Sequence, residues 1–461
     1  MVQYFITYGC WNKGACKVGS TSNGVSAVIT EMDRWVSQLA VKPEFIAIAG
    51  DNYYPKIDEA TETTPKKKYF NESELKSGFA CLRNFQRNHK VPIDIISGNH
   101  DTENTLDFEI TTSASSRRRS AGVINGESKK KCLITSAEVK MAQSELMTFT
   151  MFSCRLFGIG KHTLVLMLDS NIYIENMTKL KDCYLPLLRN TAWHLLRAGA
   201  YPAELNVSAF ASTIRDAVKE IELMLLSSHN IALFVETLRS IQNAWVNHIL
   251  ETATKLGTIK NVVIVAHHPL AYHKIKKGKV NFETGTDAGG GAEYLKLCRH
   301  IYGTFVLGSG QRSDLVVQCF YSCADLHTYQ AGTVILANAD GATPIRVNQQ
   351  IAGTGGTTLE TEYASSKQPT SSIVVSDVKI TYDIAVAIHS HGFLHWTESP
   401  DSTLTVNFIQ AVKNSREGGG THRRRRVSPY RFRITARQRQ QRQRKYNRNR
   451  NITRFRKRMN E

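Results

Sequence analysis

Four short polar clusters contain residue types that bind metal ions, and each comes where an apolar run ends. They are Gly50-Asp51-Asn52-Tyr53-Tyr54, Gly98-Asn99-His100-Asp101, His267-His268-Pro269 and Asp325-Leu326-His327. Aspartate and asparagine oxygens and histidine nitrogens are ligands for divalent and trivalent metal ions. Two metal ions that share a carboxylate can clamp a phosphate and activate a water molecule, and Asp51 is the natural shared ligand. The clusters therefore predict a two-metal site for phosphate-ester chemistry.

Buried strands must bring these clusters together, and the sequence contains suitable runs. Apolar runs at residues 45–49, 93–96, 262–266 and 315–321 lead into or closely precede the four clusters. Ligands in layered α/β folds bind at the carboxyl ends of strands, so we expect the clusters to meet at one edge of a sheet. A helix is predicted at residues 25–39, because its apolar residues recur with a period of 3.6.

The remaining pattern favours one large domain over residues 1–415, because strand-like and helical segments alternate as in a layered α/β fold. A flexible basic insertion is expected at about 108–145 and a helical insertion at about 184–240. A further strand is predicted at 302–307. The glycine-rich segment 353–356 lacks the following helix that a phosphate-binding loop needs, so a tight turn is predicted there.

The net charge of +19 lies mostly at the carboxyl terminus. Residues 416–461 contain 18 Lys and Arg against two Glu, a local charge of +16, which leaves +3 for residues 1–415. This tail cannot form an apolar core, so disorder is predicted. We expect it to bind nucleic acid through phosphate contacts; a nuclear-import signal, attachment to an anionic membrane and a solubilising extension are the alternatives. The arginines expected at nucleic acid are Arg423, Arg424, Arg425, Arg426, Arg437, Arg439, Arg442 and Arg444.

Cysteine usage and the amino terminus indicate a compartment. Nine scattered cysteines without a zinc-type pair favour reduced core thiols for most of them. The chain starts almost directly with a strand-like run and lacks a secretory signal pattern, which predicts an intracellular protein in the cytoplasm, nucleus or a virion rather than a secreted one. No run of 18 apolar residues occurs, so no membrane span is expected.

Taken in order, the clusters resemble the motifs of the calcineurin-like metallophosphoesterases and, within them, the purple acid phosphatases. Gly9-Cys10-Trp11-Asn12 forms a fifth cluster at the position of the first family motif. The resemblance covers roughly residues 2–410. It implies a central sandwich of two mixed sheets flanked by helices. It also implies a hydrolase that uses two metal ions, with Fe, Zn and Mn as the candidates.

The resemblance assigns roles to the metal-binding positions one by one. Asp51 would bridge the two metals. Tyr54 and His327 would complete the first site, and a tyrosinate there would imply iron(III). Asn99 and His267 would complete the second site.

Two further positions match the catalytic residues of the family, and two depart from its ligand pattern. His100 would face the substrate and assist the leaving group, and Asp101 would orient it. Cys10 stands where the family has an aspartate ligand, and Asp325 stands where it has a histidine. Both can still bind metals, and a thiolate at Cys10 would favour zinc or iron over magnesium. The other interpretation is a decaying site in which Cys10 packs as a hydrophobe.

The sequence therefore predicts a metal-dependent phosphatase that hydrolyses phosphomonoesters through a metal-bound hydroxide, with a basic tail that binds nucleic acid or directs localisation. One alternative is a catalytically degraded fold that acts as a scaffold or packages nucleic acid. Another is a phosphodiesterase or nuclease. An Arg-rich tail on this fold would suit an intracellular or virion protein of a large DNA virus. Asp169 ends a strand but matches no family ligand, so it is interpreted as structural.

Overall fold

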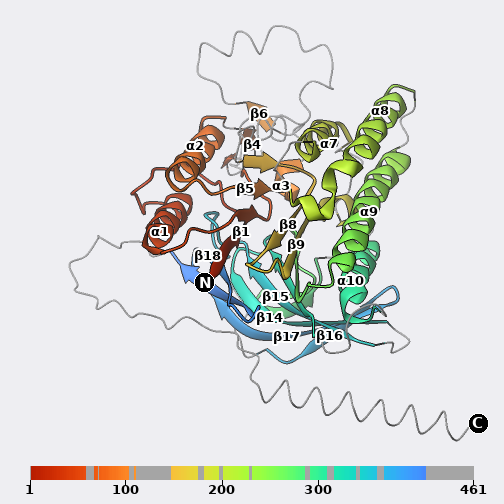
Figure 1. The fold of residues 1–461 in the computed structure, drawn as a ribbon. Helices are drawn as coiled ribbons and strands as arrows, with labels where there is room; N and C mark the ends of the chain where they lie inside the picture. The colour runs from red at the N-terminus through yellow and green to blue at the C-terminus, as the bar shows by residue number, and fades with distance from the viewer. Residues whose placement is uncertain are drawn as a thin grey trace, which may run out of the picture.

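Two mixed β-sheets lie against each other at the centre of the molecule, and helices cover their outer faces (Figure 1). The computed structural model describes residues 2–54, 56–58, 67–70, 72–102, 108–110, 147–174, 181–196, 201–227, 231–285, 291–308, 316–338, 343–360 and 368–411. The layers follow the order helices, sheet, sheet, helices. This confirms the expected sandwich of two mixed sheets flanked by helices.

The first sheet consists of β1 (Gln3–Tyr8), β2 (Ile46–Ile48), β5 (Ile93–Ile95), β7 (Met147–Phe149), β18 (Gly392–Glu398) and β19 (Leu404–Gln410). The strand order is β19-β18-β1-β2-β5-β7. Strands β1, β2, β5 and β7 run parallel, whereas β18 and β19 are antiparallel to their neighbours. Cys10, Asp51 and Asn99 follow β1, β2 and β5, so the parallel pairing brings these three residues to one edge.

The second sheet consists of β8 (Phe152–Phe157), β9 (Thr163–Leu168), β10 (Asn261–Val265), β13 (Gln318–Cys323), β14 (Tyr329–Asn338), β15 (Ile345–Ala352), β16 (Ser371–Val375) and β17 (Val378–Ile388). The strand order is β16-β17-β14-β15-β13-β10-β9-β8. Strands β9, β10, β13 and β15 form its parallel centre. Asp169, His267, Asp325 and Gly353 come directly or shortly after these four strands, again at one edge.

Two smaller sheets and the helices complete the described structure. The small sheets contain β3 (Lys56–Asp58), β4 (Lys67–Phe70) and β6 (Phe108–Ile110), and β11 (Tyr272–Lys276) with β12 (Lys279–Glu283). The helices are α1 (Gly24–Gln38), α2 (Glu72–His89), α3 (Asn99–Thr102), α6 (Asn171–Ile174), α7 (Lys181–Leu195), η4 (Ala203–Leu205), η5 (Val207–Phe210), α8 (Ala211–Ser227), α9 (Ile231–Leu256) and α10 (Gly291–Val306).

Side chains of the central strands alternate between two apolar cores, because successive residues of a strand point to opposite faces. On β1, Phe5 belongs to the core between the sheets, whereas Ile6 belongs to the core under the helices. Thr7 Oγ1 lies 2.7 Å from Ser322 Oγ of the other sheet, so this polar pair is satisfied between the sheets. Two sheets joined in this way hold their strand ends in fixed relative positions.

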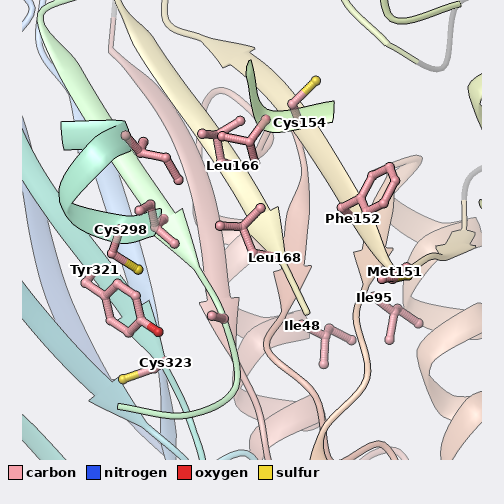
Figure 2. Packing of buried hydrophobic residues seen from close by; sticks show 14 of the residues in the cluster. Ile48, Ile95, Met151, Phe152, Cys154, Leu166, Leu168, Cys298, Tyr321 and Cys323 are labelled. Carbon is pink, nitrogen blue, oxygen red and sulfur yellow. The ribbon is translucent and has the colours of Figure 1, made fainter. Parts of the chain in front are cut away.

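The helices bury apolar stripes on the outer faces of the sheets. Figure 2 shows Leu166 and Leu168 of β9 in one cluster with Tyr321 of β13 and Cys298 of α10. Helix α1 confirms the predicted helix at 25–39, and Asn23 caps it by accepting a hydrogen bond from the Ser26 backbone at 2.9 Å.

The predicted strand at 302–307 is wrong, and the other predicted segments can be compared with the structure only where their residues are described. Residues 302–307 belong mainly to α10 and form no strand, since the run is the last turn of a buried stripe through Leu295, Cys298 and Ile301. Helices α7, α8 and α9 account for most of the described residues between 184 and 240, while the insertion itself stays a prediction. Most of 108–145 and the whole tail 416–461 lie outside the described residues.

Cysteine chemistry differs from the expectation at one pair. Cys16 and Cys81 form a disulfide, so these two are exceptions to the prediction that most cysteines are reduced core thiols. The described free cysteines are buried as expected, namely Cys10, Cys154, Cys298, Cys319 and Cys323. Within the described segments, none of the helices has both the length and the apolar composition that a membrane crossing requires.

Candidate metal centre

Asp51 lies at the centre of the site, and its two carboxylate oxygens face different groups. Oδ2 accepts a hydrogen bond from the Tyr54 hydroxyl at 2.6 Å and lies 3.6 Å from Cys10 Sγ. Oδ1 accepts a hydrogen bond from the His100 backbone at 3.1 Å and lies 3.4 Å from His267 Nε2. The residue is 1% exposed, so this carboxylate is almost entirely removed from solvent.

The first group, on the Oδ2 side, contains a thiol, a phenol and an imidazole. The Tyr54 hydroxyl lies 3.1 Å from His327 Nε2. Ligand atoms of Cys10, Asp51 and His327 all lie within 4.8 Å of one another. Such a group matches the predicted first site, with its donors close enough for one metal ion.

The second group, on the Oδ1 side, is built around His267. Its Nδ1 donates a hydrogen bond to the Ala49 carbonyl at 2.8 Å, which directs Nε2 into the site. His267 Nε2 lies 3.0 Å from Asn99 Oδ1 and 3.9 Å from Asp325 Oδ1. The structure thus brings together the residues predicted for the second site, with Asp325 at its edge.

The backbone turns sharply at three of the candidate ligands. Cys10, Asp51 and Asp325 have φ of 53°, 53° and 59°, a left-handed conformation that few residues other than glycine adopt. Gly98 allows the neighbouring loop to approach Asp51, since a Cβ there would lie 2.2 Å from Asp51 Oδ1. Strained backbone conformations persist only where the surrounding structure holds them in place, and they concentrate at functional sites.

The glycine-rich turn at 353–356 holds the Cys10 loop. The Gly355 backbone donates a hydrogen bond to the Gly9 carbonyl at 3.0 Å, and the Thr357 backbone donates one to the Cys10 carbonyl at 3.0 Å. A Cβ on Gly355 would lie 2.5 Å from the Gly9 oxygen. The chain bends at residues 355–357, and no helix follows among the described residues 358–360, in agreement with the predicted turn. The turn therefore buttresses a candidate ligand.

Burial and neighbouring charge set the protonation of the central groups. Burial opposes ionisation of Asp51, but the imidazoles of His267 and His100 and the Tyr54 hydrogen bond outweigh it and lower the pKa to about 2. Burial and then the Asp51 carboxylate raise the pKa of Cys10 and of Tyr54 well above their usual values. One carboxylate anion thus faces a neutral thiol and a neutral phenol, and both would lose a proton on binding a cation.

The predicted catalytic pair lies next to this centre. The ring of His100 lies 4.7 Å from the Tyr54 ring, centroid to centroid. Asp101 accepts hydrogen bonds from the Asn52 backbone at 2.7 Å, the Asn52 amide at 2.7 Å and the Gly98 backbone at 2.8 Å. Asp101 therefore ties two ligand loops together, while its orienting role toward His100 stays a prediction.

Asp169 supports the loop before Asn99, a role that the sequence did not predict beyond a general structural one. The Asp169 carboxylate accepts hydrogen bonds from Ser97 Oγ at 2.7 Å and from the Asn171 backbone at 2.8 Å. Asn171 Nδ2 in turn donates to the Ser97 carbonyl at 3.0 Å. Gln242 of α9 accepts a hydrogen bond from the Asp169 backbone at 3.0 Å. Asp169 is thus one part of a fully buried polar network at the base of the site.

The same segment also reaches the loop that carries His267. Ser170 Oγ lies 2.8 Å from His268 Nδ1 and accepts a hydrogen bond from the His268 backbone at 3.2 Å. The Tyr321 hydroxyl donates to the His268 carbonyl at 2.7 Å. Two loops with candidate ligands are therefore connected through residues 169–171. The only sequence signal for this role was the Asp-Ser-Asn triplet at a strand end.

Replacing Asp169 by asparagine is expected to weaken metal binding by about tenfold, the lower end of the cost of losing a direct hydrogen-bond partner of a ligand, because Asp169 acts on Asn99 only through Ser97 and Asn171. The amide group would present a donor to the Ser97 hydroxyl or the Asn171 backbone, which now donate to the carboxylate. Metal dissociation constants measured by calorimetry provide the check. Asp94→Asn is the matched control, because Asp94 is an equally buried carboxylate whose partners are Arg155 and Thr148. Equal losses in both variants would contradict the positioning role.

The tail arginines lie outside the described residues, so the predicted nucleic-acid contacts have no structural counterpart. The nine residues predicted for metal binding and catalysis all lie in described segments and converge on Asp51 or its loops, as the distances above show.

No family model and no curated protein sequence matches the chain. Among solved structures, it is similar to the purple acid phosphatase PPD1 isolated from yellow lupin (Lupinus luteus) seeds, with a TM-score of 0.40 and 12% sequence identity. The match covers 89% of this chain and 52% of that chain, so this chain spans about half the length of the lupin protein. The function proposed below therefore rests on the residues of the site.

Proposed function

We propose that the chain is a two-metal phosphoesterase of the calcineurin-like type, related to the purple acid phosphatases, that hydrolyses phosphomonoesters. The observation that carries this proposal is the placement of Asp51. Its Oδ2 faces Tyr54 and Cys10, and its Oδ1 faces His267, with the distances given above. A buried carboxylate between two groups of donor atoms is the arrangement that a bridging ligand requires.

The donor chemistry fits two ions that accept oxygen and nitrogen ligands, such as iron, zinc or manganese. The residues that would hold them are Asp51, Tyr54 and His327 for the first ion, and Asp51, Asn99, His267 and Asp325 for the second. When bound, such a pair supplies the Lewis acidity that activates water and polarises a phosphate. The hydrogen bond from His267 Nδ1 to a carbonyl fixes one ligand in the required orientation.

His100 is the residue that we assign to the leaving group. The hydrogen bond from its backbone to Asp51 Oδ1 ties it to the centre, and its side chain packs on the Tyr54 ring. His100 is half-buried, so this residue is not fully closed off from solvent beside the centre. An imidazole there would hydrogen-bond or protonate the leaving oxygen at near-neutral pH. Asp101 keeps the loop of His100 in place through Gly98 and Asn52.

Metal removal and replacement tests this function on the full chain. The protein is stripped with a chelator, reloaded with Zn²⁺, Mn²⁺ or Fe, and assayed on a chromogenic phosphomonoester and a chromogenic phosphodiester. We expect loss of monoester turnover on stripping and recovery on reloading. Turnover of the diester alone would replace the phosphatase proposal by a phosphodiesterase. Two bound metals without turnover of either ester would favour the scaffold alternative.

We also propose that the tail binds nucleic acid, because its charge of +16 is concentrated within residues 416–461. Deletion of these residues is expected to abolish retention on single-stranded RNA or DNA while leaving phosphatase turnover unchanged. If the tail neutralises six or more phosphates, affinity of the full chain should fall by about 10³-fold between roughly 50 and 200 mM salt. Fluorescence anisotropy measures both effects. Retention by the truncated chain, or affinity that salt does not change, would refute the proposal.

A further inference from the structure

Cys10 differs from the other described free cysteines in what its side chain faces. Cys154, Cys298, Cys319 and Cys323 lie in the apolar core under the helices, and Cys10 borders the core between the sheets. Cys10 Sγ instead lies 3.6 Å from Asp51 Oδ2, within ligand range of His327. A thiol that merely fills space does not need a carboxylate and an imidazole as neighbours.

The position of Cys10 is held by its backbone as well as by packing. Its backbone nitrogen donates to the Gly50 carbonyl at 3.0 Å, and its carbonyl accepts from Thr357 at 3.0 Å. Together with the φ of 53°, these bonds direct the side chain toward Asp51. The side chain is fully buried, so it is shielded from exchange with solvent thiols and oxidants. The sulfur is therefore presented to the first metal position in a fixed geometry.

We propose that Cys10 ligates the first metal ion as a thiolate and makes this position select a thiophilic ion, with Zn²⁺ as the favoured divalent one, over Mg²⁺, Ca²⁺ and Mn²⁺. This inference rests on the proposed two-metal function and deepens it by assigning the class of metal. The donors at the position would be one sulfur from Cys10, one nitrogen from His327 and oxygens from Asp51 and Tyr54. Sulfur and nitrogen ligands suit zinc and iron, whereas magnesium, calcium and manganese prefer sites made of oxygen.

The two metal positions would then differ in the hardness of their ligand atoms, and so in the metal ions that they prefer. The second position offers two carboxylates, an amide oxygen and a single imidazole, from Asp51, Asp325, Asn99 and His267. Carboxylate and amide oxygens accept Mn²⁺ and Mg²⁺ as well as zinc. The inference thus predicts a mixed pair, with a thiophilic ion near Cys10 and a less selective position near His267.

Titration of the metal-free full chain with Co²⁺ tests this inference without any activity assay. A cobalt–thiolate bond gives a charge-transfer absorption in the near ultraviolet, whereas oxygen and nitrogen ligands give only weak visible bands. We expect the wild type to show this band, saturating at about one ion of the two bound, and Cys10→Ser to lose it. Cys154→Ala removes a buried thiol outside the site and should keep it. In Cys10→Asp, the preference for Zn²⁺ over Mn²⁺ should fall by at least about tenfold.

The possible outcomes separate this inference from the function on which it rests. Binding of two Co²⁺ without a thiolate band, or a band that persists in Cys10→Ser, would overturn the role of Cys10 and leave the phosphatase proposal intact. An unchanged Zn²⁺-to-Mn²⁺ preference in Cys10→Asp would overturn the selectivity. No Co²⁺ binding by the wild type would overturn this inference together with the two-metal function.

Discussion

Replacing Asp51 by asparagine is expected to lower kcat/KM for a phosphomonoester by about three orders of magnitude, because a shared ligand stabilises transition-state charge by several kcal/mol. The carboxamide keeps the size of the side chain, but it removes the anion that faces both donor groups. It also presents an NH₂ group where Asp51 now accepts hydrogen bonds from Tyr54 or from the His100 backbone. Both metal positions should therefore weaken together.

The control for this variant is Asp216→Asn on α8, which removes the same charge from an exposed helix position. Its turnover should equal that of the wild type. Thermal unfolding of both variants without added metal separates loss of a ligand from loss of the fold. An Asp51→Asn protein that is folded and retains more than about a tenth of wild-type turnover would contradict a bridging role.

Loss of the Cys16–Cys81 disulfide is expected to lower the free energy of unfolding by about 4 kcal/mol, because the bond closes a loop with a sequence separation of 65. The bond joins the segment after β1, which carries Cys10, to helix α2. Ser77 of α2 supports the same junction, since its hydroxyl accepts a hydrogen bond from the Cys16 backbone at 2.9 Å and donates one to the Cys16 carbonyl at 3.0 Å. Urea unfolding of the Cys16→Ala/Cys81→Ala double variant provides the measurement.

Reductant supplies the control for the disulfide. It should destabilise the wild type to about the level of the double variant and leave the double variant unchanged. A wild type that is insensitive to reductant, with both thiols free by mass spectrometry after alkylation, would show that the bond does not form. Disulfides persist mainly in oxidising compartments. Formation of this bond in the purified protein would therefore argue against the expectation of an intracellular protein.

The sequence pattern predicted the parts of the site that depend on local order along the chain. The clusters that contain Asp51 and His267 each follow an apolar run that proved to be a central parallel strand. The ligand role of His267 itself was implied by the family resemblance. Helix α1 was predicted correctly from its apolar period. The strand predicted at 302–307 was wrong, because a short apolar run at the end of a helix has the same pattern as a short buried strand.

The sequence pattern could not predict contacts between segments that lie far apart along the chain. The bond between Ser97 and Asp169 joins residues 72 positions apart, and the pair Ser170 and His268 spans 98 positions. No periodicity encodes such pairs. Ser97 and Asp169 follow strands of different sheets, and Ser170 and His268 follow β9 and β10, which lie side by side only once the second sheet has formed. The direction of the Cys10 side chain likewise depends on a left-handed backbone turn, which residue type alone does not indicate for a cysteine.

The metal content of the purified full chain tests the two-metal phosphoesterase most directly. Elemental analysis after purification in metal-supplemented, chelator-free buffer should give about two transition-metal ions per wild-type chain, as a site with a shared carboxylate requires. Asp51→Asn purified in parallel should hold fewer than about one, and Asp216→Asn should match the wild type. A wild type that holds no more metal than Asp51→Asn would contradict the two-metal site, and with it the proposed function.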